Sequence, residues 1–163
     1  MDDDRGRDDP VAVVIEPIGT VVGGRNDAID DHWGLVEATI ELTGDRLDVD
    51  ATAGLAGFSH LEVVYLFHLV AGKDVEWGAR HPRGRTDWPA VGILAQRAKN
   101  RPNRIGVSVC RLLAVDGLQL RVQGLDAIDG TPVLDVKPYM SAFGPRGEVR
   151  QPPWVEQLMR DYW

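Results

Sequence analysis

Two polar segments of this chain carry the residues best suited to chemistry. The first reads Arg101-Pro102-Asn103-Arg104-Ile105-Gly106-Val107-Ser108, and the second runs from Leu125 to Tyr139. Each is rich in glycine, proline and polar side chains, yet each joins an apolar stretch typical of a β-strand. We therefore interpret both segments as loops that the fold holds rigidly for a ligand.

The first loop favours a negatively charged or zwitterionic ligand. Proline fixes its own φ angle, so Pro102 stiffens a segment that also carries the guanidinium groups of Arg101 and Arg104. A guanidinium presents a planar set of donors that matches the oxygens of a carboxylate or a phosphate. We therefore expect this loop to face such a group.

The second loop offers hydrogen-bond acceptors beside a tight turn. Asp129-Gly130 is typical of a turn, whose backbone amides can face a ligand. The carboxylates of Asp126 and Asp129 can accept hydrogen bonds from ribose hydroxyls or from an amino group. A second interpretation stays open, in which this loop is a self-bonded Asx turn that only introduces a strand at 133–136.

Short β-strands must position these loops. Within 36–42, apolar residues alternate with polar ones, which is the period of a strand with one buried face. Further strand-like runs are expected at 11–15, 18–22, 58–69, 91–95, 105–114, 118–124 and 133–136. Asp116-Gly117 predicts a two-residue hairpin turn, in which both central residues need a positive φ. Proline followed by apolar residues at helical spacing predicts a helix within 154–163.

These elements predict a mainly β protein, a compact single-domain β-barrel with a short C-terminal helix. A chain of 163 residues can bury a real core, since a domain near this size hides roughly 70% of its unfolded surface. Residues 1–10 are acidic and lack apolar periodicity, so we expect them to form a disordered tail before a domain at 11–163.

One face of the strand-like run at 58–69 is unusual. It carries His60, Glu62 and His68 beside apolar residues, because side chains alternate along an extended segment. Two imidazoles and a carboxylate on one face are typical of a pocket wall. Equally, each histidine can be satisfied by a local hydrogen bond.

The composition excludes several classes of protein. Cys110 is the only cysteine, which rules out an intrachain disulfide and a cysteine-ligated cluster, and we expect it to be a small core residue. The first residues are acidic where a secretory signal is basic and apolar, and no run approaches the ~20 apolar residues of a membrane span. We therefore expect a cytoplasmic protein that does not contact membranes.

The charge distribution is uneven. The net charge of −7 argues against a general polyanion binder, because nucleic-acid affinity depends largely on Lys and Arg. Acidic residues gather in the first third, however, whereas Lys and Arg gather between 73 and 111. This basic middle is either a phosphate-contacting patch or an ordinary solvated surface.

Three further kinds of site are not expected. The glycines at 19, 23 and 24 have the wrong spacing for a Rossmann phosphate loop, and no helix is predicted after them. The four histidines do not fall in a metal-binding pattern, so we predict no metal. Ser59 and Ser108 lie in no nucleophile-elbow context.

Several segments in order resemble the TrmO/TsaA-like family. The segments that carry the resemblance are Gly57-Phe58-Ser59-His60, Phe67-His68, Arg83, Ala95-Gln96-Arg97, Arg101-Pro102-Asn103-Arg104-Ile105-Gly106 and the stretch from Asp129 to Tyr139. Members are S-adenosylmethionine-dependent methyltransferases that act on adenosine beside the tRNA anticodon. The resemblance implies a β-barrel that forms a homodimer and binds S-adenosylmethionine near the dimer interface, outside the Rossmann class.

The resemblance also implies roles for individual residues. Those expected to contact the cofactor are Arg25, His68, Leu69, Arg83, Leu94, Ile128, Asp129, Gly130 and Thr131. Those expected to line the same cleft or hold the substrate are Arg97, Arg101, Asn103, Arg104, Ser108 and Lys137. Loss of a proton from an exocyclic adenine amine must be assisted, and the candidates are Asp126, Asp129, His60 and Tyr139. The sequence does not choose among these four.

Two departures from the family pattern bear on function. Many members carry Pro-Arg-Gln in the first loop, where this chain has Gly23-Gly24-Arg25-Asn26-Asp27, so only Arg25 can substitute. Arg104 stands where the family often has a second proline. The predicted function is methylation of the exocyclic amine of a modified adenosine next to the tRNA anticodon. The alternatives are a noncatalytic barrel that binds an adenosyl ligand or a partner, and a methyltransferase acting on a small molecule.

Overall fold

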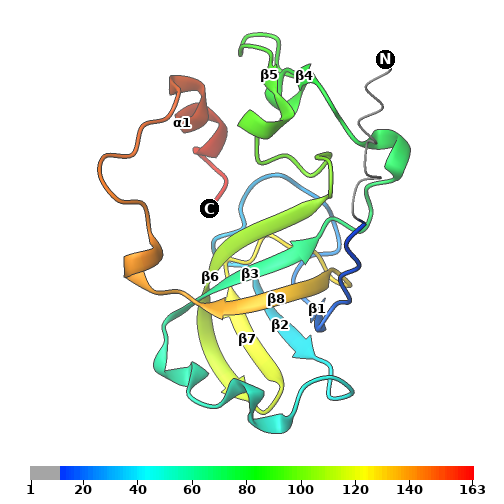
Figure 1. The fold of residues 1–163 in the computed structure, drawn as a ribbon. Coiled ribbons are helices and arrows are strands. Elements are labelled where there is room, and N and C mark those ends of the chain that lie inside the picture. Colours follow the sequence, from blue (N-terminus) through cyan, green and yellow to red (C-terminus); the bar gives the residue numbers. More distant parts are fainter. Residues whose placement is uncertain (1–11) are drawn as a thin grey trace, which may run out of the picture.

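The computed structural model describes residues 12–163, and its centre is a closed antiparallel barrel (Figure 1). The predicted tail at 1–10 lies outside the described residues. The barrel strands are β1 (Gly19–Val22), β2 (Glu37–Leu42), β3 (His60–Leu66), β6 (Ile105–Asp116), β7 (Gln119–Gln123) and β8 (Pro132–Pro138). Their order around the barrel is β1-β2-β7-β6-β3-β8. The predicted β-barrel is therefore confirmed.

The barrel core follows from the alternation of side chains along the strands. In β2, Ala38 and Ile40 point inward, and in β3 the inward residues are Leu61, Val63 and Tyr65, all less than a tenth exposed. These side chains pack with inward residues of the other strands into one apolar cluster. The prediction of one buried face at 36–42 is confirmed.

The β6–β7 hairpin is present, but its turn differs from the prediction. Asp116 pairs with Gln119, so the two central residues are Gly117 and Leu118 rather than Asp116 and Gly117. Gly117 has a φ of 55°, whereas Asp116 and Leu118 do not have positive φ values. A glycine at the first central position alone suffices for this turn, because one positive φ is typical of the type II′ class.

Three other predicted elements are wrong in part. The described part of the run at 11–15 forms no strand, and Val13 and Val14 are 77% and 87% exposed. The run at 91–95 splits into β5 (Val91–Gly92) and a 3-10 turn, because it pairs only with the short β4 (Ala79–Arg80) outside the barrel. The helix α1 covers Pro153–Met159, and the chain from 160 to 163 leaves it.

Two short strands and the helix lie outside the barrel at one of its ends. Figure 1 shows β4, β5 and α1 beyond the upper end of the barrel, with residues that follow α1 running back toward β6. Six short 3-10 turns connect the described elements: Val49–Thr52, Leu55–Gly57, Gly72–Asp74, Pro82–Gly84, Ile93–Ala95 and Ser141–Phe143. Among residues 12–163, no helix is long and apolar enough to cross a membrane.

Candidate functional site

The carboxylate of Asp126 accepts hydrogen bonds from three hydroxyl groups. The phenol of Tyr65 donates to its Oδ1 at 3.0 Å, and the Ser108 hydroxyl donates to the same oxygen. The phenol of Tyr162 donates to Oδ2. Asp126 lies in the loop between β7 and β8, so a loop, two barrel strands and the segment after α1 meet at one carboxylate. This is the densest polar arrangement around any of the four predicted catalytic residues.

Strand register places two of these hydroxyls side by side. Tyr65 in β3 pairs with Gly106 in β6, and Ser108 follows two positions later on the same face. Tyr65 and Ser108 are 2% and 7% exposed. A Cβ on Gly106 would lie 2.4 Å from Cε2 of Tyr65, so only glycine leaves room for this ring. Buried hydroxyls need a partner, and Asp126 supplies one to both.

The electrostatics keep these phenols protonated. Burial, and then the charge of Asp126, raises the pKa of Tyr65 far above its ordinary value. The same two causes, in the same order, raise the pKa of Tyr162. Both phenols therefore remain donors at every physiological pH, and the site holds a carboxylate in a fixed orientation.

The second predicted loop is fastened to the first glycine-rich loop. The carboxylate Oδ1 of Asp129 accepts a hydrogen bond from the backbone N–H of Gly23 at 2.7 Å. The backbone N–H of Asp129 donates to the carbonyl of Arg25 at 2.7 Å, and that of Gly130 donates to Val21 at 2.8 Å. The carboxylate bond of Asp129 thus spans 106 positions, so the interpretation as a self-bonded Asx turn is wrong for this side chain.

Arg25 folds onto its own loop. Its guanidinium donates to the backbone carbonyls of Asp31 and His32 and stacks over Trp33, with 4.6 Å from Cζ to the ring centroid. His32 has a φ of 65°, a left-handed conformation that is uncommon for a residue with a side chain. Arg25 therefore stabilises the conformation of its own loop.

Arg83, in the 3-10 turn Pro82–Gly84, also contacts the loop that carries Arg25. It makes a two-pronged ion pair with Asp31, with distances of 3.0 and 2.7 Å. The Arg83 hydrogen bond lowers the pKa of the Asp31 carboxyl below its ordinary value. Arg83 has a φ of 52°, and such left-handed residues cluster at functional sites. Its charge also acts on Tyr162, which places Arg83 near the Asp126 cluster.

The remaining cofactor candidates differ in exposure. An added Cβ on Gly130 would come 4.0 Å from Nε2 of His68, so His68 faces the 128–131 turn. Leu69 and Leu94 are 67% and 78% exposed, whereas Thr131 is 2% exposed. The hydrogen bond from the Thr131 N–H to the Ile128 carbonyl, at 3.1 Å, closes this turn.

The first predicted loop uses its guanidinium groups mainly to fasten backbone. Arg101 donates to the carbonyl of Gln96 at 2.8 Å, and Arg104 donates to Val70 at 2.7 Å with a φ of 53°. Arg97 donates to Val107, and its charge acts on the Tyr65 phenol. Asn103 is exposed beside them. Of the predicted substrate residues, Ser108 is therefore part of the Asp126 cluster, and Arg97 is close enough for its charge to act on Tyr65.

Three predicted site residues lie at the other end of β3. His60 is five positions from Tyr65, which corresponds to about 16 Å along a strand. Its ring bonds to Ser59, and its carbonyl accepts from the Tyr139 N–H at 2.9 Å. Lys137 pairs with Asp135. The structure therefore does not bring His60, Tyr139 or Lys137 to the Asp126 cluster.

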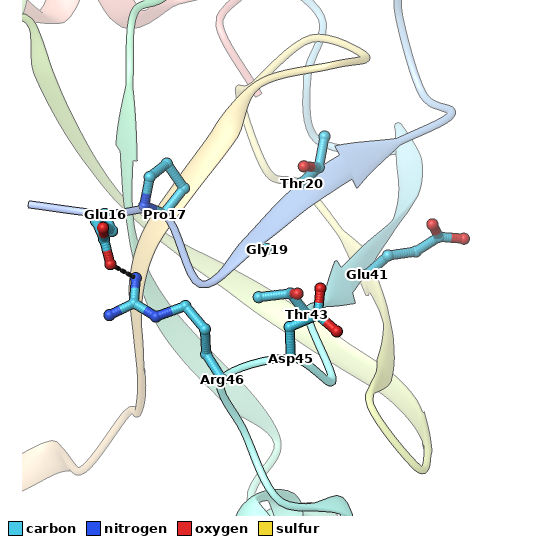
Figure 2. Close-up of a pocket in the computed structure, with 8 residues that line it drawn as sticks. All are labelled: Glu16, Pro17, Gly19, Thr20, Glu41, Thr43, Asp45 and Arg46. Carbon is cyan, nitrogen blue, oxygen red and sulfur yellow. Dashed lines mark ion pairs between the residues drawn. The ribbon is translucent and has the colours of Figure 1, made fainter.

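Two hollows in the surface lie away from this cluster. Figure 2 shows the larger, about 460 Å³, between β1 and the turn after β2, where Arg46 pairs with Glu16 at 2.9 Å. Its lining contains no predicted site residue. The second, about 230 Å³, is lined by Glu62, Lys137, Pro138, Tyr139, Met140 and Phe143.

Cys110 is a core residue, as predicted. It is 2% exposed and packs in the barrel cluster. Burial, followed by the charge of Asp126, raises the pKa of its thiol to about 12, so it is not a nucleophile at neutral pH. Among residues 12–163, no group of three or more His, Cys, Asp or Glu side chains is arranged to hold a metal ion.

Sequence reasoning missed two members of the cluster. Tyr65 was not singled out within the strand-like run at 58–69, although a buried phenol usually signals a polar partner. Tyr162 carried no signal, because its contact with Asp126 depends on how the segment after α1 returns to the barrel. Asp31 was likewise part of an acidic stretch with no distinguishing mark.

Comparison with known proteins shows the family to which this chain is related. The family model described as the tRNA-methyltransferase O N-terminal domain matches residues 31–144. The chain belongs to this family. A Methanothermobacter thermautotrophicus relative named "Probable S-adenosyl-L-methionine-binding protein" is 38% identical, over 80% of this chain and 87% of that protein. The Escherichia coli tRNA (adenine(37)-N6)-methyltransferase is 36% identical, over 69% of this chain and 51% of that enzyme.

Solved structures agree with the family membership. The crystal structure of TrmO from Pseudomonas aeruginosa superposes with a TM-score of 0.70 at 30% identity, covering 86% of this chain and 61% of that one. The chain therefore spans half to three fifths of these larger TrmO proteins, and most of the archaeal relative. The TrmO/TsaA-like resemblance is confirmed.

Proposed function

We propose that this protein is an S-adenosylmethionine-dependent methyltransferase that acts on the exocyclic amine of a modified adenosine next to the tRNA anticodon. The observation that carries the proposal is the convergence of three hydroxyls on Asp126, at the barrel end where the 23–33 loop contacts both Asp129 and Arg83. The names of the bacterial relative and of the matched family support tRNA as the substrate.

The residues around the 128–131 turn fit an S-adenosyl group. Gly130 has a φ of 79° and no side chain, so a ligand can approach the backbone beside His68. Leu69 and Leu94 offer exposed apolar surface for an adenine ring, and the carboxylates nearby suit ribose hydroxyls or an amino group. When bound, the cofactor supplies a methyl group already activated on a sulfonium.

Asp126 is the candidate that the geometry favours for receiving the amine proton. A carboxylate offers about four acceptor positions. Oδ1 of Asp126 accepts from Tyr65 and Ser108, and Oδ2 accepts from Tyr162, which leaves one position on Oδ2 for an incoming amine N–H. Asp129 is a weaker candidate, because its Oδ1 is occupied by the Gly23 N–H.

Such a base does not need an unusual affinity for protons. The exocyclic amine of adenine is conjugated and poorly nucleophilic, but it becomes strongly acidic as its new bond to carbon forms. The protein must therefore hold Asp126 against that nitrogen and align the two reacting groups. Hydrogen bonds join the loop at 23–33 both to the 128–131 turn and to the segment after α1, whose Tyr162 contacts Asp126.

We extend the proposal to a cytoplasmic homodimer. Leu69, Trp77 and Leu94 are 67%, 76% and 78% exposed, more apolar surface than an isolated subunit needs to show. Trp77 and Leu94 flank a backbone hydrogen bond of 2.8 Å from Ile93 to Gly78, so they are neighbours. Sedimentation velocity of the wild type and of a Trp77→Ser, Leu94→Ser variant tests this: a dimer that becomes a monomer supports it.

The test of the activity is transfer of a labelled methyl group from S-adenosylmethionine to tRNA. Purified protein is incubated with tRNA that carries the modified adenosine, with unmodified transcript, and with tRNA already methylated. We expect label only in the first pool, and a rate of transfer lower by roughly 10²–10⁴-fold with Asp126→Asn. Equal absence of label from all pools, together with intact cofactor binding, would instead favour the noncatalytic barrel.

RNA binding gives an independent measurement. Because each neutralised phosphate releases counterions, the logarithm of the binding constant falls with the logarithm of salt concentration. We expect Arg97→Ala with Lys99→Ala to flatten that dependence, since both side chains are exposed in the basic middle of the chain. An unchanged slope would point to a small-molecule acceptor.

A further inference from the structure

Tyr162 stands out because its contact crosses from the segment after α1 to the proposed proton acceptor. We propose that Tyr162 is a positioning residue for Asp126, whose hydroxyl fixes Oδ2 and so directs the remaining acceptor position of the carboxylate at the substrate amine. The inference rests on the proposed function and deepens it. No part of the matched domain at 31–144 includes this residue.

The three donors are divided between the two carboxylate oxygens of Asp126. Tyr65 and Ser108 both donate to Oδ1, and both come from neighbouring barrel strands. Tyr162 donates to Oδ2 and comes from outside the barrel. Two donors on one oxygen hold that oxygen in place but still allow the carboxylate plane to rotate. A donor on the second oxygen removes this freedom.

The segment after α1, residues 160–163, is held at several points. The backbone N–H groups of His32 and Trp33 donate to the carbonyls of Asp161 and Tyr162, each at 2.8 Å. These bonds join the segment to the loop that carries Arg25 and Asp31. Tyr162 is therefore held from both its backbone and its hydroxyl.

A close approach confirms how tightly this segment packs. A Cβ on Gly34 would lie 2.7 Å from the carbonyl carbon of Trp163, so only glycine admits the segment here. The ring of Trp163 packs edge-on against Tyr162, with centroids 4.9 Å apart. The segment occupies a site shaped for it.

The helix α1 is anchored separately. The indole N–H of Trp88 donates to Oε1 of Gln157 at 2.8 Å, and the rings of Trp88 and Trp154 lie 6.3 Å apart. Trp88 is itself 4% exposed. Anchors at both ends of the segment give Tyr162 the fixed position that a positioning residue needs.

The charges around Tyr162 are consistent with this role. Its hydroxyl faces Asp126 and Tyr65, and the charges of Asp30 and Arg83 also act on it. Asp126 and Asp30 both disfavour the phenolate, so the phenol stays a donor. Tyr162 should therefore add no ionisation of its own to the pH dependence of catalysis.

The main experiment compares Tyr162→Phe with wild type in the tRNA methylation assay. We expect kcat to fall roughly tenfold, the loss of one hydrogen bond to a charged group, while KM for tRNA and the Kd for S-adenosylmethionine stay unchanged. The matched control is Thr52→Val, which removes a buried hydroxyl bonded to Gly117 at the hairpin end. It should cost stability without changing kcat.

A double variant separates positioning from a general structural effect. If Tyr162 acts through Asp126, then Asp126→Asn with Tyr162→Phe should be no slower than Asp126→Asn alone. Additive losses would overturn the proposal. So would a rise in kcat for Tyr162→Phe, because it would mean that the segment obstructs the site.

A second readout does not depend on activity. Ionisation of tyrosine is followed by absorbance at alkaline pH, over the range in which circular dichroism shows an intact fold. Asp126→Asn should allow Tyr162 and Tyr65 to ionise at lower pH, and the change should be smaller when the same substitution is made in the Tyr162→Phe variant, where only Tyr65 responds. Titration that Asp126→Asn leaves unaltered would overturn the contact. If wild type transfers no methyl group but the titration result holds, the proposed function fails while the contact stands.

Discussion

Asp129 and Gly23 are joined by a hydrogen bond of 2.7 Å, although 106 positions separate them in sequence. This bond, together with the 2.7 Å bond from the Asp129 N–H to the Arg25 carbonyl, makes one unit of two loops that the chain lays down far apart. It gives Asp129 a structural task at the proposed cofactor site, separate from the proton-accepting task proposed for Asp126.

Asp129→Ala should therefore weaken both folding and cofactor binding. We expect a loss of about 1 kcal/mol in the free energy of unfolding, because an exposed charge-assisted hydrogen bond is lost. Urea denaturation measures this, and calorimetric titration with S-adenosylmethionine should show weaker binding. Asp129→Asn keeps an acceptor oxygen for the Gly23 N–H and should retain most of both. If Asn and Ala behave alike, the carboxylate acts on the ligand directly.

The Asp31–Arg83 pair should contribute to stability in a pH-dependent way. Arg83 lowers the folded-state pKa of Asp31 below 3.8, so its contribution is complete above about pH 4 and disappears as pH falls through the lower folded-state value. Asp31→Asn should cost about 0.5–1 kcal/mol at pH 7, discounted for partial exposure, and progressively less as the pH falls below 4. Thermal unfolding across this range checks both ends.

A second ion pair of the same chemistry serves as the control. Arg85 and Asp87 also form a two-pronged contact, but their side chains are 50% and 58% exposed, against 24% and 28% for Arg83 and Asp31. Asp87→Asn should leave the melting temperature unchanged. Equal losses in the two variants would show that burial does not decide the strength of these pairs.

Alkaline pH should destabilise the fold through the buried acids of the core. The pKa of Cys110 rises from 9.0 to about 12 on folding, so the folded state keeps a proton that the unfolded state releases. The contribution of this thiol to the free energy of unfolding is complete below pH 9. It is lost as the pH rises toward 12, and the free energy of unfolding then falls by up to about 1.4 kcal/mol per pH unit. Cys110→Ala should reduce the slope of unfolding free energy against pH.

The same thiol should resist alkylation in the native protein. We expect iodoacetamide at pH 7.5 to modify Cys110 only as fast as the protein unfolds, because the side chain is 2% exposed and protonated. Mass spectrometry in 0 and 6 M urea follows the reaction. Rapid modification of the native protein would contradict this burial.

Gly106→Ala should disturb the Asp126 cluster by displacing the ring of Tyr65. The new Cβ would lie 2.4 Å from the ring of Tyr65, which is packed in the core and must shift with its hydroxyl. We expect a loss of about 1–3 kcal/mol in the free energy of unfolding, as for other overpacked cores, and lower methyl transfer. Gly92→Ala is the control, because a Cβ there meets open space.

The sequence determined the local structure and the location of the loops. Alternating side chains such as Ala38 and Ile40 specify strands, because a strand with one wet face needs that period. Of the two segments interpreted as loops because of their composition, 101–104 and 125–131 are loops, whereas 105–108 and 132–138 belong to β6 and β8. Where the prediction failed, as at 91–95, the pairing partner was too short to extend a strand, which no local pattern records.

The tertiary structure decided which of these residues work together. Asp126, Tyr65, Ser108 and Tyr162 come from four separate parts of the chain and meet only when the barrel closes and the segment after α1 returns to it. The closed barrel also places His60 and Tyr139 at the opposite end of β3. Residue type and spacing indicate what each side chain can do, but partners that distant in sequence are set by strand register and packing, which depend on the whole chain at once.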